Sequence, residues 1–444
     1  MPSRDYLLLL GMAAGALSVL VSNPAGVSFV GRPAQAAAAE GRPTVELFRE
    51  VYQLVRDRYV TSPDDLKLIE GAIKGLMGEL DPHSEYLDAQ AFRTIQEEAL
   101  GEFGGLGLQL AMENGLVKVV APVANSHAAK AGLRPGDLIT RLDDTPIRGL
   151  TINQAIERMR GPVDSTIRLT IRRKDQKEPT EMSVVRDLIR VQTVFSQTIG
   201  GDVGYIRISK FNDLTTAGLQ KALKDLSTRN PANRLRGFIL DLRNNPGGVL
   251  EQAISVSSAF LKSGDIVSTR GRNPEDSRLF TVARTSNDLG KGKPLIVLIN
   301  GGSASAAEIV AGALQDRGRA TVLGTRSFGK GSVQSTSPIG DGKALKLTTA
   351  FYYTPGGHSI QAKGITPDIE VMQEGREVQR PRAAIDSEAT LRNHLKGDGE
   401  ERAGSEAYVP SDSNDDKAIK MAIDLLHGAR SHPAFPANRA STHN

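Results

Sequence analysis

Two serines in a run of small residues are the first candidates for chemistry. Ser303 and Ser305 lie in GGSASAAE, residues 301–308, after the apolar run PLIVLI and before a helical pattern. Small residues at a strand-to-helix turn leave a serine hydroxyl exposed, and a backbone N–H at the helix start can face a developing oxyanion. The segment therefore suits a serine nucleophile. A serine at this point can also simply cap the helix, which is a common role of serine.

A lysine lies in a second loop that could act with this serine. Lys330 follows the predicted strand at residues 320–324 and comes 25 residues after Ser305. A lysine amine can deprotonate serine only when it is neutral, and burial in apolar surroundings lowers its pKa. Loops at the ends of neighbouring parallel strands can face each other across a crevice. The alternative is an ordinary surface lysine, which is the common state of this residue type.

Two other motifs overlap Lys330, and each lacks an essential part. Gly324, Gly329 and Lys330 approach a phosphate-binding loop, but Gly331 stands where the hydroxyl that coordinates magnesium belongs. Residues 327–330 fit the S-x-x-K motif of penicillin-binding enzymes, but no K-T-G element follows. Neither nucleotide binding nor penicillin-type chemistry is therefore favoured.

Two glycine-rich segments could bind a ligand through their backbone. DLRNNPGG, residues 241–248, follows a predicted buried strand, and adjacent glycines there can present N–H groups or simply form a turn. GGLGL, residues 104–108, precedes another strand, and AGLRPGDLI follows at residues 131–139. A glycine-rich loop before a sheet edge can capture a terminal carboxylate while the peptide adds as a strand. The alternative is a turn of an unrelated β-barrel.

Metal and thiol chemistry find no support in the sequence. The chain has no Cys, which excludes thiolate metal sites, Cys nucleophiles and disulfides. None of its seven His stands in a metal-ligand spacing, although His83 and His358 could act as acid or base. We therefore expect neither a metal nor a cofactor.

The elements that must position these residues form a predicted α/β core. Between about residues 191 and 371, strand-like runs such as VGYIRI, GFILDL and PLIVLI alternate with helical patterns, for example at residues 216–226 and 306–315. This alternation predicts a largely parallel sheet. The apolar runs are too continuous for a sheet that is wet on one face.

Other segments flank the predicted core. Hydrophobic periodicity predicts helices at residues 44–60 and 62–80, and short β-branched runs predict a compact β module at residues 103–173. Residues 373–415 are polar and without periodicity, which predicts a linker, and a last helix is predicted at residues 416–426.

Length and charge fit a soluble protein of several domains. The chain has 444 residues, enough for roughly three folded units at about 150 residues each. A net charge of +4 over this length is too weak to indicate nucleic acid binding.

The N-terminus predicts export. Residues 6–21 carry no charge and follow Arg4, and AQA at residues 34–36 is the small-x-small pattern of a signal peptidase site. The apolar run is shorter than the ~20 residues of a comfortable transmembrane helix. We expect a cleaved signal, with an uncleaved N-terminal anchor as the alternative, and a protein that works in the periplasm in either case.

Several motifs, in order, resemble one family. They are DPHSEYL (81–87), the two glycine-rich strings of the β module, DLRNNPGG (241–248), GSASAAE (302–308), SFGKGSVQ (327–334) and GHSIQAKGITPDI (357–369). Together they resemble the carboxyl-terminal processing, or tail-specific, proteases, which use a Ser/Lys dyad and carry a PDZ domain. The resemblance implies an α/β protease core with a crotonase/ClpP-like sheet and helices, an inserted, mostly β PDZ domain, and flanking helices. The implied domains are a signal peptide (1–36), an N-terminal helical region (37–95), the PDZ domain (96–185), the protease core (186–372), and a polar linker with a C-terminal helix (373–444).

The resemblance also implies roles for individual residues. Ser305 is the nucleophile, in preference to Ser303, because it stands at the family's spacing to the general base Lys330, and Gln334 orients the lysine. The backbone N–H of Ala306 and that of one of two glycines form the oxyanion hole, namely Gly247 or Gly248. The PDZ residues expected to bind an apolar C-terminal tail are Gly104, Gly105, Leu106, Gly107 and Leu108.

Partners and rival functions follow from the same resemblance. We expect protein substrates with apolar C-termini, a homodimer or larger homo-oligomer, and an adaptor protein as a further partner. One rival is a catalytically silent PDZ scaffold that only binds tails. A second is an acyl-transfer or hydratase enzyme on a related α/β core, because that architecture recurs with other chemistries.

Overall fold

The computed structural model describes residues 44–229, 234–283, 286–373 and 386–435. The predicted export signal and its cleavage motif lie outside these residues. Within them, every helix is too short or too polar to cross a bilayer. The chain divides into two units, residues 1–70 and 71–444, which are described separately.

The described part of the first unit, residues 44–70, contains one complete helix. Helix α2 (Thr44–Arg58) forms where periodicity predicts it, and α3 (Asp65–Gly78) begins at the end of this unit. The apolar residues of α2 are exposed, as Leu47, Val51 and Leu54 each keep half or more of their surface in solvent.

A small β module follows helix α4 (Ala89–Leu100). Its sheet has the order β3-β4-β5-β7-β8, with β6 beside β5, and β2 pairs separately with β9. The strands are β2 (Glu102–Gly105), β3 (Leu108–Glu113), β4 (Leu116–Pro122), β5 (Leu138–Leu142), β6 (Thr145–Pro146), β7 (Thr166–Arg172), β8 (Thr180–Val185) and β9 (Asp187–Arg190), and the helices are α5 (His127–Lys130) and α6 (Ile152–Met159). Alternate residues of β7, such as Ile167, Leu169 and Ile171, are buried, so the module has a hydrophobic core of its own.

The α/β core is built on a six-stranded sheet that is largely parallel, as predicted. Its order is β10-β11-β12-β15-β16-β19, and every pairing except that of β10 with β11 is parallel. The strands are β10 (Val194–Ile199), β11 (Val203–Ile208), β12 (Gly237–Asp241), β15 (Leu295–Ile299), β16 (Thr321–Gly324) and β19 (Ile369–Glu370).

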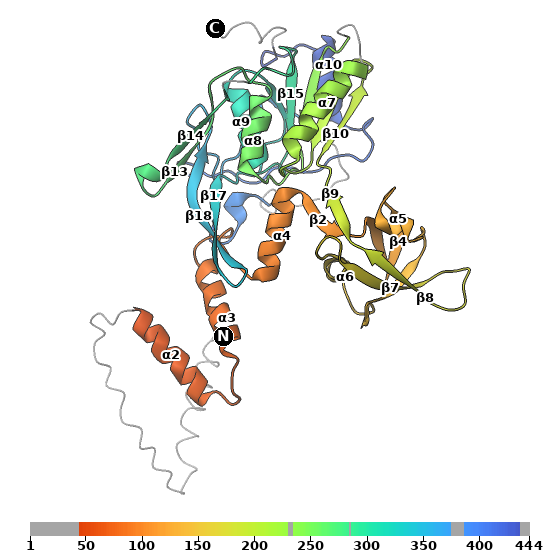
Figure 1. Cartoon of the computed structure of the whole chain (residues 1–444). Helices are drawn as coiled ribbons and strands as arrows, with labels where there is room; N and C mark the ends of the chain where they lie inside the picture. Colours follow the sequence, from red (N-terminus) through yellow and green to blue (C-terminus); the bar gives the residue numbers. More distant parts are fainter. Residues whose placement is uncertain (1–43, 230–233, 284–285, 374–385, 436–444) are drawn as a thin grey trace, which may run out of the picture. The chain divides into compact units, whose positions relative to one another are not determined.

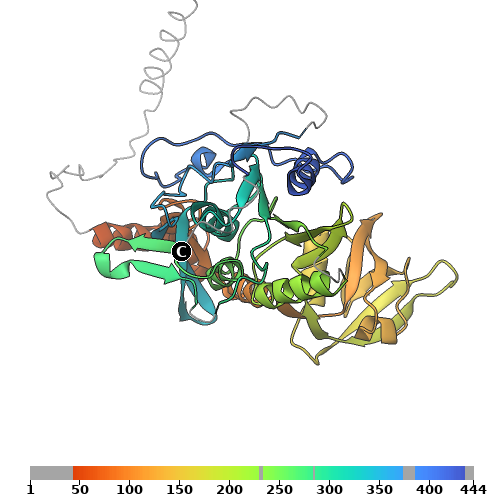
Figure 2. The same ribbon diagram turned by 90° about the horizontal axis from the view of Figure 1, so that it is seen from above.

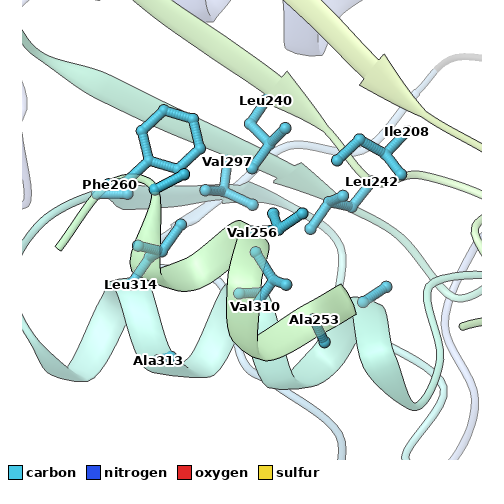
Figure 3. Close-up of a cluster of buried hydrophobic side chains, with 14 of the residues drawn as sticks. Ile208, Leu240, Leu242, Ala253, Val256, Phe260, Val297, Val310, Ala313 and Leu314 are labelled. Carbon is cyan, nitrogen blue, oxygen red and sulfur yellow. The ribbon is translucent and has the colours of Figure 1, made fainter. Parts of the chain in front are cut away.

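Helices cover both faces of this sheet, which explains its unbroken apolar runs. Helices α7 (Thr215–Arg229), α8 (Leu250–Ser258) and α9 (Ala306–Asp316) pack on one face, where Leu240 and Val297 meet Val256 and Val310 (Figure 3). Helix α10 (Lys417–His427) packs on the other face, against residues such as Ile239 (Figures 1 and 2). A strand buried on both faces needs no polar alternation.

A second sheet lies beside the first and was not predicted. Strand β18 (Lys343–Tyr353) pairs with β1 (Glu85–Leu87), β13 (Asp265–Gly271) and β17 (Ser332–Gly340), and β14 (Arg278–Thr281) pairs with β13. A short 3₁₀ turn, η1 (Pro274–Asp276), follows β13. Much of β17 is exposed and carries Ser, Thr, Pro and Gly, a composition that gives a weak strand signal.

The segment predicted to be a linker differs from expectation. Residues 386–415 contact the core, and the 3₁₀ turn η3 (Glu388–Thr390) begins with a fully buried Glu388. Farther on, the backbone N–H of Gly301 donates to the carbonyl of Glu406. Polar composition misleads here because the segment is held by hydrogen bonds rather than by an apolar stripe.

A buried ion cluster joins helix α10 to the loop after β12. The Arg243 guanidinium lies 2.6 Å from Asp241 and 2.8 Å from Asp416, and all three side chains are at least 96% buried. Asp416 also caps α10 by accepting from the N–H groups of Ala418 and Ile419. The cluster therefore anchors α10 to the loop after β12, which continues to Gly247 and Gly248.

Arg243→Ala is expected to destabilise the protein by about 3–5 kcal/mol, because it leaves two buried carboxylates without their cation. Urea unfolding followed by circular dichroism measures the change. The control is Arg168→Ala, which breaks an exposed pair with Asp144 and should cost about 1 kcal/mol or less. Equal losses in the two variants would contradict the prediction.

Candidate active site

Ser305 occupies a strained turn between strand β15 and helix α9. Its backbone has φ 54° and ψ −114°, an unusual conformation for a residue with a side chain. Such conformations cost about 1–3 kcal/mol and concentrate at functional sites. The Ser305 side chain is half-buried, and its N–H donates to Oε2 of Glu308 at 2.7 Å.

Ser303, the neighbouring serine, is committed to structure. Its side chain is fully buried, and its hydroxyl donates to the carbonyl of Leu242 at 2.8 Å while accepting from the N–H of Asn300. A hydroxyl engaged in this way is a poor nucleophile. This leaves Ser305 as the candidate in the segment.

Lys330 lies in the loop between strands β16 and β17 and is half-buried. Burial lowers the pKa of its amine below the ordinary lysine value, and the positive charge of Lys346 lowers it further. The carboxylates of Glu388, Glu308 and Asp81 act in the opposite direction. The net lowering of the pKa is what a lysine base requires.

Glu308 brings the serine loop and the lysine loop together. It is fully buried, and its Oε2 accepts from the N–H of Ser305 at 2.7 Å and from that of Lys330 at 2.9 Å. Its Oε1 accepts from the Ser327 hydroxyl and from the N–H of Gly329. Burial raises the pKa of Glu308 to about 7, although the four hydrogen bonds oppose the rise. One carboxylate thus fixes the relative positions of both loops.

Glu308 was not predicted to be a functional residue. The available signal was a single carboxylate in the apolar run AAEIVAGAL, whose residues 306–314 are all buried. A charged residue in such a run requires several hydrogen-bond partners.

Glu308→Gln is expected to lower kcat/KM for peptide cleavage by about 10²-fold, because the amide cannot accept from all four donors and the loops shift relative to each other. The matched control is Glu251→Gln, the same change in the first turn of α8 at an exposed position. Kinetics with thermal unfolding as a check on folding measure the effect. A folded Glu308→Gln variant within threefold of the parent would argue against this role.

The glycine loop after β12 lies directly against Ser305. A Cβ at Gly247 would come within 2.8 Å of the Ser305 Cβ, and Gly247 has φ 102°, so glycine is required there. The Gly247 N–H donates to Oδ1 of Asn245 at 2.9 Å. Among the hydrogen bonds of the described residues, none uses the N–H of Gly248 or Ala306. Of the two glycines predicted for the oxyanion hole, Gly248 is therefore the one whose N–H is available to a substrate oxygen.

The Gln334 side chain forms hydrogen bonds to two hydroxyls. Its Nε2 donates to the hydroxyls of Ser332 and Thr348, at 2.9 and 3.1 Å. Thr348 in turn donates to Asp81, in the DPHSEYL segment. That Gln334 orients Lys330 stays a prediction.

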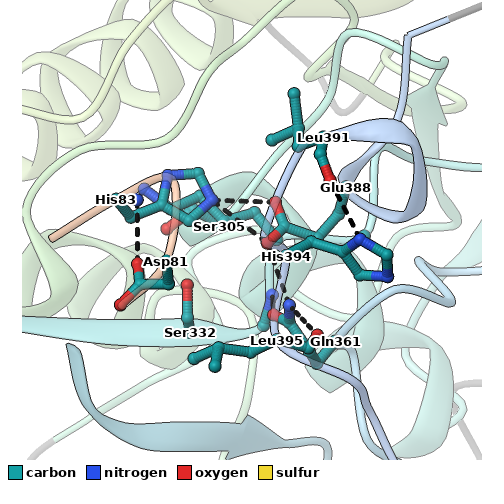
Figure 4. A network of polar contacts seen from close by, with 12 residues as sticks. Asp81, His83, Ser305, Ser332, Gln361, Glu388, Leu391, His394 and Leu395 are labelled. Carbon is teal, nitrogen blue, oxygen red and sulfur yellow. Dashed lines mark hydrogen bonds and ion pairs between the residues drawn. The ribbon is translucent and has the colours of Figure 1, made fainter. Parts of the chain in front are cut away.

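Glu388 and His83 form a second buried polar network close to the site (Figure 4). His83 Nε2 lies 2.8 Å from Glu388 Oε2, and Gln361 Nε2 donates to Glu388 Oε1 at 2.9 Å. The sequence analysis named His83 as a possible acid or base but gave no sign of Glu388.

The residues of the β module that are predicted to bind a carboxylate lie partly in strand β2 and partly between β2 and the start of β3. Gly104 and Gly105 belong to strand β2 and pair with β9, where they are buried. Leu106 packs in the core of the module, and Gly107 has φ 71° just before β3 begins at Leu108. Binding of a peptide terminus by these residues stays a prediction.

Among the residues with described positions, no cluster of His, Asp and Glu is placed to hold a metal ion.

Comparisons with known proteins match the α/β core, the β module and the N-terminal region. Residues 202–371 match peptidase family S41, residues 118–173 match a PDZ domain, and residues 26–91 match the N-terminal domain of the activating protease CtpB. The protein is thus a serine peptidase that carries a PDZ domain.

Relatives that match over most of this chain identify the family of the peptidase. The chain is 50% identical over 391 residues to a carboxy-terminal-processing protease of Bartonella bacilliformis, covering 88% of this chain and 89% of that one. It is 32% identical to carboxy-terminal processing protease CtpA of Bacillus subtilis, covering 82% and 75% of the two chains. Among solved structures, the photosystem II D1 C-terminal processing protease is 27% identical and covers 74% of this chain and 94% of that chain, with a TM-score of 0.42. The protein belongs to the carboxy-terminal processing proteases.

Proposed function

We propose that this peptidase is an endopeptidase in which Lys330 activates Ser305 and the PDZ domain binds the apolar C-terminal tail of a protein substrate. The observation that carries the dyad is the shared Glu308 oxygen, which accepts from the backbone N–H of both residues. The lowered pKa of Lys330 and the strained backbone of Ser305 support it.

The proposed reaction proceeds through an acyl-enzyme. Neutral Lys330 takes the hydroxyl proton of Ser305 while the serine oxygen attacks the scissile carbonyl. The N–H groups of Ala306 and Gly248 stabilise the oxyanion, and each such donor is worth about 2.7–4 kcal/mol. The lysine ammonium then gives its proton to the leaving amine. Lys330 next deprotonates a water that hydrolyses the ester, and Ser305 regains its proton. In this proposal, Gln334 orients the side chain of Lys330.

The wider context is also proposed. The uncharged segment at residues 6–21 and the AQA motif support export to the periplasm, with the segment either cleaved or retained as an anchor. A homodimer or larger homo-oligomer and an adaptor protein are the proposed partners, besides substrates.

Cleavage of an unfolded protein with an apolar C-terminal tail tests the function. The same protein with its last three residues changed to Asp is the control, and we expect slower cleavage because an acidic tail loses its apolar contacts with the PDZ domain. Equal rates would contradict tail recognition. Tail binding without cleavage would instead favour the silent scaffold.

A further inference from the structure

A buried carboxylate enters the site from beyond the matched peptidase region. That region ends at residue 371, whereas Glu388 belongs to η3 in the segment 386–395. The Glu388 side chain is fully buried, and its N–H donates to the carbonyl of Phe328 at 3.2 Å. Phe328 lies two residues before Lys330, so the segment is attached directly to the lysine loop.

Gln361 makes a second attachment on the other side of the lysine. Its Nε2 donates to Glu388 Oε1 at 2.9 Å, and its Oε1 accepts from the N–H of Gly331 at 3.0 Å. Its Nε2 also donates to the carbonyl of Leu395, which closes the segment around the amide. Glu388 is thereby tied to the backbone on both sides of Lys330.

His83 holds the same carboxylate from the N-terminal side. Its Nε2 lies 2.8 and 3.1 Å from the two Glu388 oxygens (Figure 4). The DPHSEYL loop and the C-terminal segment, 305 residues apart in sequence, therefore meet at one carboxylate.

The charges around this carboxylate include the proposed base. The carboxylates of Glu388, Glu308 and Asp81 raise the pKa of Lys330. The ammonium of Lys346 in β18 lowers it. His394, in the same segment, is also influenced by Glu388. A buried carboxylate is expensive unless cations and donors compensate it. His83 contacts this carboxylate directly, and the Lys330 amine and the His394 ring lie within the range of its charge.

We propose that Glu388 is a positioning residue of the active site: its carboxylate, clamped by His83 and Gln361, holds the loop at residues 328–331, which carries the proposed base Lys330. The negative charge of Glu388 also favours the protonated form of that lysine. The site is thus completed by a segment outside the matched peptidase region. The inference rests on the proposed Ser305/Lys330 function.

The test is the pH dependence of Ser305 labelling by a fluorophosphonate probe, which needs no protein substrate. In the full-length parent the rate should rise with pH as Lys330 loses its proton. In Glu388→Gln, removal of the negative charge favours neutral Lys330, so the rise should move to lower pH. In Glu388→Asp the charge stays but the shorter side chain cannot reach both clamps. We therefore expect its rise at the pH of the parent, with a maximal rate lower by about tenfold.

Glu401→Gln is the matched control. Glu401 lies just beyond the segment and pairs with His394 at 3.1 Å, so its removal also breaks a histidine–carboxylate pair, but its charge is not among those that shift the pKa of Lys330. Its profile should superimpose on that of the parent. A folded Glu388→Gln variant with the parent's profile, or an equal shift in Glu401→Gln, would overturn the inference.

Three further outcomes separate the role of Glu388 from the proposed function. If Glu388→Gln does not fold, Glu388→Asp decides, because a maximal rate equal to the parent's would contradict positioning. A parent that labels while Ser305→Ala does not supports the dyad whatever the Glu388 variants do. A parent without labelling at Ser305 overturns both proposals.

Discussion

Ser305→Ala is expected to abolish proteolysis, with a loss in kcat of about 10⁴-fold or more. Removal of the nucleophile eliminates the acyl-enzyme path and leaves only binding and oxyanion stabilisation, and serine nucleophile knockouts lose activity on this scale. The backbone of the turn is held by Glu308 through the Ser305 N–H, which alanine retains. The variant should therefore fold like the parent. Cleavage of an unfolded protein with an apolar tail, measured beside circular dichroism, gives the loss.

Ser303→Ala is the control for this prediction. It removes a buried hydroxyl that joins Leu242 to Asn300, so a stability loss of about 1–3 kcal/mol is expected. Below its unfolding temperature it should still cleave substrate and react with a fluorophosphonate. If Ser303→Ala lost labelling and Ser305→Ala kept it, the nucleophile would be assigned to the wrong serine.

Lys330→Ala is expected to lower kcat/KM by about 10²- to 10⁴-fold, the usual contribution of a general base. In the parent, kcat/KM should rise with pH. The base works only when neutral, and its neutral fraction increases as pH rises through its pKa, which burial and Lys346 lower. Burial raises the pKa of Glu308 to about 7, and its ionised form is the better acceptor for the N–H groups of the two loops, so ionisation of Glu308 should also increase kcat/KM as pH rises.

Lys346→Gln tests the direction in which the charge of Lys346 shifts the pKa of Lys330. Removal of its positive charge should raise the pKa of Lys330 and move the rise in kcat/KM to higher pH. The measurement is the initial rate of a fluorogenic peptide between pH 6 and 10. A flat profile in the parent, or a move to lower pH in Lys346→Gln, would argue against Lys330 as the base.

The order of elements could be predicted where a local pattern existed. The predicted helices at residues 216–226 and 306–315 correspond to α7 and α9, within a few residues at each end. The parallel sheet followed from continuous apolar runs, because strands covered on both faces need no polar residues. The hairpin of β17 and β18 was not predicted: most of β17 is exposed, and its pairing depends on neighbouring strands rather than on composition.

The sequence by itself determined the family, the alternation of strands and helices, and the two loops that carry Ser305 and Lys330, because each of these is encoded in contiguous residues. Only the tertiary structure decided which groups surround them. Glu308 joins the two loops, Ser303 is withdrawn into a structural hydrogen bond, and Glu388 arrives from a segment that composition assigned to a linker. The reason is physical: hydrogen bonds and burial between residues far apart in the chain leave no periodic signal, and they exist only once the sheet and its helices bring those residues together.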